Sequence, residues 1–225
     1  MNFRRLLLLL TVSSLLFSCS KDKDYSLDNF WVTSATIYTD DVQPYLIVTD
    51  SGDKLFPSIS NIDYKPTNQQ RVWVSYTILN DTNGEFDFYV RVNNVSEILT
   101  KDIIKLTDSN KDSIGNDPIN IENLWFTDNY LTIQFLYGGG GAVHFVNLVK
   151  NADSLYTDDG KPILEFRHNR NHDLYNNALR GWSSFNLKSL ENEETDSVVF
   201  ILKAKSIKEN KPFRKELIYR SSIED

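Results

Sequence analysis

Apolar and polar side chains alternate along most of the chain with a period of two residues, and amphipathic helical periodicity is scarce. β-branched and aromatic residues dominate the alternating runs, and turn-forming residues bound them, which is the pattern of half-buried β-strands. The segment Asp50–Leu55 contains a glycine and predicts a hairpin turn. In the first half, the runs cover residues 30–39, 45–50, 71–79 and 86–95. They predict a small β domain.

The alternating pattern resumes after residue 119 in about six further runs, separated by turn signals such as Thr157–Pro162. Short strands at this spacing favour an antiparallel β-sandwich. Between the halves, Leu106–Pro118 is polar, rich in Asp and Asn, and contains Gly and Pro, as interdomain linkers are. A short helix is expected only at Ser96–Ile104. We therefore predict an all-β protein with a first domain at residues 30–105, a linker at 106–118 and a sandwich at 119–225.

The N-terminus has the order of an export signal. Arg4 and Arg5 precede the apolar run Leu6–Phe17, which is shorter than the ~20 residues that a membrane-spanning helix needs. We expect a signal peptide at residues 1–18 and a polar tether at 19–29. The chain's one cysteine, Cys19, follows "LFS" in a sequence that resembles a bacterial lipobox. A thiol there would carry a diacylglycerol, and a further acyl chain on the new N-terminus would make the anchoring stable. The alternative is a plain signal peptide followed by an incidental cysteine.

The chain is acidic, and cleavage would make it more so. Removing residues 1–18 from the 225 leaves 207, and the loss of Arg4 and Arg5 moves the formal charge from −7 to −9. No stripe of lysine and arginine remains that could follow a phosphate backbone, so we expect no nucleic-acid partner.

The three histidines are the first candidates for chemistry. His168 and His172 lie in "EFRHNRNHD", after a strand-like segment; on an extended strand they would be roughly 13 Å apart at ~3.3 Å per residue, too far to share one zinc ion. His144 could pair with His168 across a hairpin through Thr157–Gly160. The metal hypothesis brings all three histidines together. The alternative is structural, with His168 and Asn169 hydrogen-bonded to loop backbone and His172 exposed. We favour the structural alternative and expect no cofactor.

Other motifs give weaker signals. "GWSSF" lacks the second glycine of a nucleophile elbow, so a triad of Ser183, His172 and Asp173 is disfavoured. "YGGGGA" lacks the Lys-Ser/Thr of a phosphate-binding loop and is expected to be a flexible hairpin loop. The alternating Asp108, Asn110 and Asp112 fail the EF-hand pattern, although a looser calcium site stays open. Core packing is the default for the tryptophans, and a sugar-stacking platform is the alternative. These are Trp31, Trp73, Trp125 and Trp182.

Taken in order along nearly the whole chain, "DSGDKLFP", "QRVWVSYT", "GNDPI", "LWFTDNYLTIQF", "VHFVNLV", "LEFRHNRNHD" and "GWSSFNL" resemble the NigD-like lipoproteins of Bacteroidetes. The resemblance implies an OB-type barrel followed by a β-sandwich. The family takes its name from association with a bacteriocin locus, and the resemblance supplies no catalytic residues.

These observations predict a non-enzymatic, lipid-anchored envelope protein, in the outer membrane on its periplasmic or surface face. We expect it to bind a protein, as an interaction module or an immunity-like lipoprotein. A glycan-binding module is the alternative, because an OB barrel can also bind oligosaccharides. A metal-dependent enzyme using His144, His168 and His172 is a third hypothesis.

Overall fold

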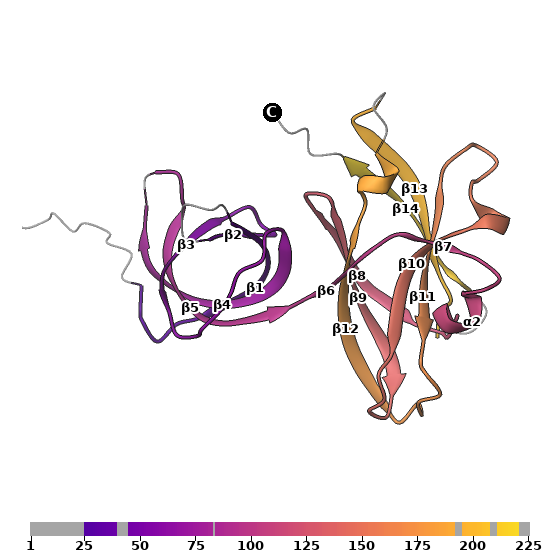
Figure 1. Cartoon of the computed structure of the whole chain (residues 1–225), viewed down its shortest axis with the longest axis horizontal. Helices are drawn as coiled ribbons and strands as arrows, with labels where there is room; N and C mark the ends of the chain where they lie inside the picture. The colour runs from indigo at the N-terminus through magenta and orange to yellow at the C-terminus, as the bar shows by residue number, and fades with distance from the viewer. Residues whose placement is uncertain (1–24, 40–44, 83, 192–194, 208–210, 221–225) are drawn as a thin grey trace, which may run out of the picture.

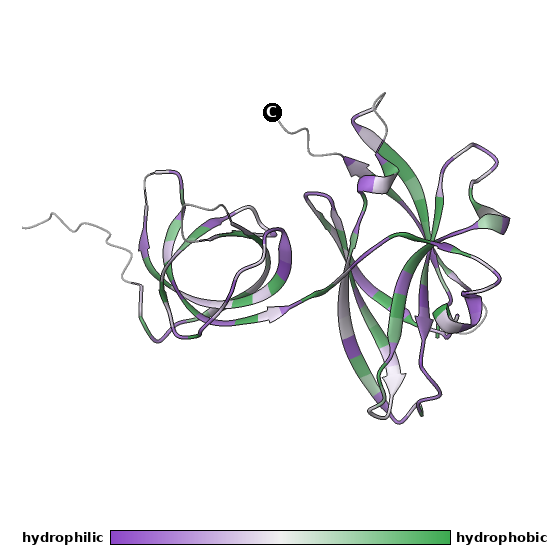
Figure 2. Cartoon of the chain, viewed as in Figure 1, coloured by the Kyte–Doolittle hydropathy of each residue, from purple (hydrophilic) through white to green (hydrophobic). Residues whose placement is uncertain are grey.

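The computed structural model describes residues 25–39, 45–82, 84–191, 195–207 and 211–220, which form two β domains side by side (Figure 1). The predicted signal peptide, Cys19 and most of the tether lie outside the described residues. Hydrophobic residues are concentrated in the strands, while the loops are mostly hydrophilic (Figure 2). The buried hydrophobic residues form one cluster in each domain.

Five strands close the N-terminal barrel in the order β1-β2-β3-β5-β4. Neighbouring strands are antiparallel except for the parallel pair β3 and β5. The alternation seen in the sequence places Ile37, Val74 and Val90 inside, each fully buried. The predicted small β domain is therefore an OB-like barrel. Its strands are β1 (Trp31–Tyr38), β2 (Leu46–Thr49), β3 (Lys54–Ser60), β4 (Gln70–Asp81) and β5 (Phe88–Glu97).

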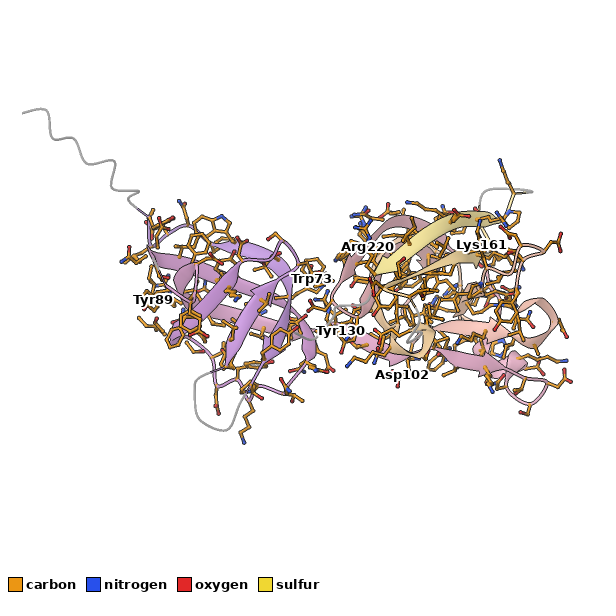
Figure 3. The ribbon with its side chains drawn as sticks, turned by 90° about the horizontal axis from the view of Figure 1, so that it is seen from above. Trp73, Tyr89, Asp102, Tyr130, Lys161 and Arg220 are labelled. Carbon is orange, nitrogen blue, oxygen red and sulfur yellow. The ribbon has the colours of Figure 1, made fainter. Side chains whose placement is uncertain are left out.

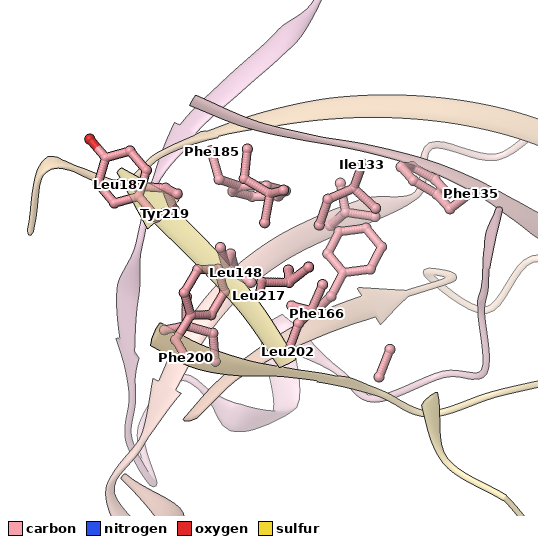
Figure 4. Packing of buried hydrophobic residues seen from close by; sticks show 14 of the residues in the cluster. Ile133, Phe135, Leu148, Phe166, Phe185, Leu187, Phe200, Leu202, Leu217 and Tyr219 are labelled. Atoms are coloured by element: carbon pink, nitrogen blue, oxygen red, sulfur yellow. The ribbon is translucent and has the colours of Figure 1, made fainter. Parts of the chain in front are cut away.

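The C-terminal domain is a sandwich of a five-stranded sheet, β14-β13-β11-β10-β7, and a four-stranded sheet, β6-β12-β9-β8. Aromatic and aliphatic side chains from both sheets, including Phe135, Phe166, Phe185 and Phe200, fill the space between them (Figure 4). The strands are β6 (Leu99–Asp102), β7 (Ile104–Leu106), β8 (Asn120–Thr127), β9 (Tyr130–Gly139), β10 (Phe145–Asn151), β11 (Ile163–Asn169), β12 (Asn177–Asn186), β13 (Ser197–Ala204) and β14 (Phe213–Arg220).

The predicted division into a barrel and a sandwich is confirmed, with differences in pairing. The pairs β6–β12, β7–β10 and β11–β13 are parallel, so the sandwich is mixed rather than wholly antiparallel. The parallel pairs arise where the chain enters the sandwich from the barrel, and where β12 crosses to the opposite sheet before β13 returns beside β11.

The domain boundary lies earlier than the predicted linker at residues 106–118. β6 and β7 already pair with sandwich strands, and Ile98, between β5 and β6, is buried and donates its backbone N–H to Arg71 O. The polar segment forms instead the short helix α2 (Lys111–Ile114), with Ile114 buried. Asn110 of this segment hydrogen-bonds local backbone, and Gly115 lies against Asn169. The polar residues of 106–118 therefore form turns within the sandwich. Ser96–Ile104, expected to be helical, is extended because both sheets supply partners for its backbone.

Candidate functional site

The hairpin from β10 to β11 brings His144 and His168 together, as the position of this hairpin between the two histidines predicted. Val146 is in register with His168, and the two imidazole rings are stacked at 5.0 Å between centroids. His144 Nδ1 lies 2.8 Å from His168 Nε2, and His168 Nδ1 lies 3.3 Å from Pro118 O. Tyr137 packs against both rings. The pair is enclosed by protein, because His168 is fully buried and the His144 side chain is 7% exposed.

Asp173 holds the other side of His144. Its Oδ2 lies 3.0 Å from His144 Nε2 and also accepts the backbone N–H groups of Gly140, Gly141 and Ala142 at 2.6, 3.0 and 3.1 Å. The backbone N–H of Gly140 and the hydrogen bond from His144 hold the pKa of Asp173 well below its usual range, despite an opposing effect of burial. The glycine-rich loop is therefore an anion-binding loop, and its anion is a side chain of the same protein.

The ionised carboxylate fixes the tautomer of His144. Because it accepts from His144 Nε2, a neutral His144 presents a bare Nδ1, which can accept from His168 Nε2. A neutral His168 that donates there has no proton on Nδ1, which then only lies against Pro118 O. The glycines are required sterically: a Cβ at Gly138 would lie 2.1 Å from Tyr175, and one at Gly140 would lie 3.0 Å from Asp173 Oδ1. The sequence shows this loop as four glycines, and only the distant Asp173 reveals what they bind.

A tight turn at the end of β11 places Asp173. Asn171 and His172 both have positive φ, 52° and 62°, and Asp173 N donates to Arg170 O at 3.0 Å. A type I′ turn has positive φ at both central residues. His172 is exposed at this turn, whereas Asn169 Nδ2 donates to Ser113 O at 2.7 Å. "EFRHNRNHD" is thus a strand end and a hydrogen-bonded turn.

The structure joins two of the three histidines and separates His172 from them. Within the described part of the chain, no group of three or more His, Cys, Asp or Glu side chains could hold a metal ion. Two residues of the looser calcium site considered from the sequence are also engaged in the local fold: Asp108 pairs with Lys111 at 2.9 Å, and Asn110 Oδ1 accepts the Thr107 N–H at 2.8 Å.

Ser183 does not meet Asp173 as a hydrolase triad would require. Ser183 is fully buried on β12 opposite Ile133, whereas Gly139, next to the loop that binds Asp173, pairs with Asn177. Six residues along a strand separate these two positions by about 20 Å. The Asp173 carboxylate bonds His144, and His172 lies apart at the turn.

The two domains meet at a buried ion pair that was not predicted from the sequence. Arg71 of β4 is fully buried on the outside of the barrel, and its Nη2 lies 2.7 Å from Asp50 Oδ2 in the β2–β3 turn. Asp50 Oδ2 also accepts from Ser34 Oγ and from Trp125 Nε1 of the sandwich, each at 2.6 Å. Burial would raise the pKa of Asp50, but the hydrogen bonds and charge of Arg71 outweigh it, so the pKa is lowered.

Further contacts cross the same junction, where Trp73 and Tyr130 are labelled in Figure 3. Arg71 Nη2 donates to Thr132 Oγ1 at 3.2 Å, and Tyr38 Oη donates to Asp128 Oδ2 at 2.6 Å. Trp73 packs edge to face against Trp182, with 5.5 Å between ring centroids. Three of the four tryptophans therefore join the domains rather than forming a platform for sugars.

A group of aromatic side chains, of which Tyr89 is exposed and the others are partly buried, lies at the other end of the barrel. Phe56 of β3 packs against Phe86 and against Tyr89 of β5, with interplanar angles of 47° and 87°. Tyr89 is labelled at the end of the barrel away from the sandwich (Figure 3). Sugar rings stack on faces of exposed aromatic rings, and this tilted group offers no pair of parallel faces. Trp31 does lie parallel to Tyr76, but Tyr76 is buried.

Two grooves lie along one edge of the sandwich, between β8 of one sheet and β14 of the other. One has a volume of about 740 Å³ and is lined by the start of both strands, including Ile121, Leu136 and Phe213. The other, about 490 Å³, is lined by Phe126 and Asp128 together with Ile218 and Arg220 of β14. Neither groove contains the residues singled out from the sequence. The signal that could have found them is the concentration of cations in "KPFRKELIYR".

Comparison with protein families accounts for both domains. A model of the NigD-like N-terminal OB domain matches residues 34–98, and a model of the NigD-like C-terminal beta sandwich domain matches residues 102–217. The chain belongs to the NigD-like family. The two matches meet beside Ile98, where the structure also places the boundary between the NigD-like domains. Comparison with curated proteins found no match.

Solved structures of similar proteins share this NigD-like architecture. A protein of Parabacteroides distasonis described as toxin related is 32% identical, with a TM-score of 0.72 over 86% of this chain and 94% of that one. A NigD-like immunity protein of Bacteroides caccae is 17% identical, with a TM-score of 0.66 over 88% and 100%. A lipoprotein candidate of Bacteroides fragilis is 9% identical, with a TM-score of 0.59 over 88% and 100%. The last two likenesses concern the fold alone.

None of the helices in the described ranges of this NigD-like chain is long and apolar enough to cross a membrane.

The buried histidine pair predicts that the NigD-like fold loses stability in mild acid. Burial lowers the pKa of His168, and the neighbouring His144 lowers it further, while Pro118 O and Asp117 oppose the shift only in part. Below the unfolded pKa of about 6.5 the unfolded chain therefore binds more protons than the folded one, so the free energy of unfolding falls as pH falls. Urea unfolding at pH 7.5, 6.5 and 5.5 measures this.

The His168→Phe variant is the control for this prediction, because it removes the titrating ring and keeps an aromatic side chain. Its free energy of unfolding should change less between pH 6.5 and 5.5 than that of the unmodified protein. Equal slopes in the two proteins would show that other groups cause the pH dependence. Tyr137, Asp173 and Asp117 face the pair, and Asp173 contributes only at lower pH because its pKa is depressed.

Proposed function

We propose that this NigD-like protein is a lipid-anchored, non-enzymatic protein of the cell envelope whose work is to bind another protein. The observation that carries the proposal is the closed state of the His144–His168–Asp173 cluster. Three of its ring nitrogens and the Asp173 carboxylate bond one another or the glycine-rich loop, and the fourth ring nitrogen, His168 Nδ1, lies against Pro118 O. The side chains are almost shielded from solvent. A general acid or base must reach a substrate proton. These groups instead hold two loops together.

The junction of the domains supports a binding role of the whole molecule. The ion pair of Arg71 and Asp50, the Trp125 hydrogen bond and the Trp73–Trp182 contact fix the barrel against the sandwich. A surface that extends over both domains is then organised before a partner arrives, and an organised surface loses less conformational entropy on binding.

The descriptions of two proteins with the same fold support the same proposal. One structure of the same fold is called an immunity protein and another a lipoprotein candidate. Proteins that neutralise a toxin act by binding it. We therefore include an immunity-like role, with a bacteriocin or a related toxin as partner, in the proposed class of protein-binding functions.

Photo-crosslinking in the native cell tests the proposal without assuming a chemistry. A photoreactive residue is placed at exposed positions on each domain, such as Ile59 on the barrel and Ile218 on the sandwich, and crosslinked products are identified by mass spectrometry. A specific protein adduct from one face, competed by the unlabelled protein, supports a binding function. Adducts that are the same from every face and cannot be competed contradict it.

A further inference from the structure

Strand β14 is a long and regular edge of the five-stranded sheet, and its charged side chains are its protection against unspecific pairing. All eight of its residues are in register with β13, from Ser197 opposite Arg220 to Ala204 opposite Phe213, without a bulge. On its other side β14 pairs with no strand in the described structure. Bulges and very short strands are common ways to protect an edge, and β14 has neither.

The edge is basic in an acidic protein. Strand β14 itself contains three cations, Arg214, Lys215 and Arg220, and one acid, Glu216. With Lys203, Lys205 and Lys211 from the end of β13 and the connection to β14, residues 203–207 and 211–220 have a net charge of +5. The chain as a whole has 24 basic and 31 acidic residues, so 18 and 30 remain elsewhere, a net charge of −12. Glu216 pairs with Lys161 at 2.7 Å, whereas Arg214, Lys215 and Arg220 are exposed and form no ion pair within the described ranges.

Alternation along β14 separates two kinds of side chain. Leu217 and Tyr219 are buried and point into the core, so Arg214, Ile218 and Arg220 lie on the opposite, outer face. The two grooves described above flank the strand at its start and at its end. Their walls contain the apolar side chains Phe213 and Phe126, and Arg214, Ile218 and Arg220 line them as well. Figure 3 shows Arg220 at the end of the strand that lies nearer the barrel.

We propose that β14 takes up an extended, acidic segment of the partner protein as an additional β-strand. The free backbone groups of the edge would bond the segment, as in other β-strand additions. Acidic side chains at alternate positions would lie beside Arg214 and Arg220, and apolar ones would face the grooves between β8 and β14. This inference rests on the proposed protein-binding function and names its surface and the chemistry of its partner.

The same charges argue against other occupants of the edge. A second copy of β14 would bring two strands of like net charge side by side, and the repulsion between them disfavours such a pair. An anionic membrane or a nucleic acid would pair with the cations but would leave the row of backbone donors and acceptors unused. An extended acidic peptide uses both features at once.

Binding of synthetic octapeptides to the full mature protein tests the proposal. Three fluorescent peptides are compared by anisotropy: alternating Val-Glu, alternating Val-Lys, and alternating Gly-Glu, which has the same charge as the first but low strand propensity. We expect Val-Glu to bind about tenfold or more tighter than either of the others, because only it combines the sign of charge with an extended backbone. Its binding should slow amide hydrogen exchange in residues 213–220.

Charge reversal on β14 and on the barrel separates local from overall electrostatics. Arg214→Glu with Arg220→Glu should weaken Val-Glu binding about tenfold or more, since both cations facing the acidic side chains are reversed. Lys54→Glu with Lys65→Glu makes the same change in net charge at exposed barrel positions and should leave binding unchanged. Arg214→Gln with Arg220→Gln is the milder variant if the first one fails to fold.

Several outcomes would overturn the inference. The first is that the Val-Lys peptide, the Gly-Glu peptide or phosphatidylglycerol vesicles bind as tightly as the Val-Glu peptide. The second is that the Val-Glu peptide slows amide hydrogen exchange in the barrel instead of in β14. A cellular partner that crosslinks to another face would leave the proposed protein-binding function intact and remove β14 as its site.

Discussion

Replacing Asp50 with alanine should lower the free energy of unfolding by about 3–5 kcal/mol, because it leaves the guanidinium of Arg71 buried without its counter-charge. Arg71 is fully buried, and its Nε already lacks a hydrogen-bond partner among the described residues. The substitution also removes the acceptor of Ser34 Oγ and of Trp125 Nε1. Urea unfolding followed by tryptophan fluorescence measures the loss, since Trp125 itself reports on the junction.

Two further variants make this prediction specific. Asp63→Ala removes an exposed carboxylate from the same barrel and should change stability by less than about 0.5 kcal/mol. The double variant Asp50→Leu with Arg71→Leu removes both charges and should recover much of the loss, because apolar replacements of a buried pair are often tolerated. A loss below about 1 kcal/mol for Asp50→Ala would mean that water reaches Arg71 and replaces its partner.

Replacing Cys19 with alanine should abolish acyl labelling and release the protein from the membrane fraction completely. The reason is that Cys19 is the only cysteine of the sequence and stands where the apolar run ends. Each buried methylene of an acyl chain contributes about 0.8 kcal/mol, and more than one chain is needed for lasting attachment. Labelling with an alkyne fatty acid, followed by fractionation of the cells, measures both effects.

Ser20→Ala is the matched control, because it changes the neighbouring residue and leaves the thiol in place. It should keep full labelling and full membrane association. If the Cys19→Ala protein stays acylated, the lipid is attached elsewhere. If it loses the label but stays with the membrane, a protein contact rather than the lipid holds it there.

The alternation of apolar and polar residues was enough to predict a small β domain and a sandwich, because one face of each strand is buried. The barrel was implied by the resemblance to the NigD-like family. Alternation could not place the boundary, since the polar residues of 106–118 serve turns inside the sandwich. His144 and His168 were expected to be neighbours because a hairpin joins their strands. Asp173 was not expected to hold His144, because a turn with two positive φ values after β11 directs it there.

The domain junction shows the limit of such reasoning more clearly. In "QRVWVSYT", alternation places Arg71 and Trp73 outside the barrel, where charged and aromatic residues are normally exposed to water. Their burial depends on partners up to 109 positions further along the chain, such as Thr132 for Arg71 and Trp182 for Trp73. These partners become visible only when the sandwich is docked on the barrel, and no local pattern in the sequence encodes that docking.

Ile98, the single residue that connects the two domains, limits how they can move relative to each other. Because Ile98 joins β5 to β6 directly and the junction is locked, the barrel and the sandwich cannot swing about a flexible joint. The first described residues enter the barrel at Tyr25, which packs on Phe88 near the Tyr89 end, away from the sandwich. A lipid at Cys19 would therefore attach the molecule through the barrel, and the barrel would be a rigid spacer between the point where the chain enters it and β14.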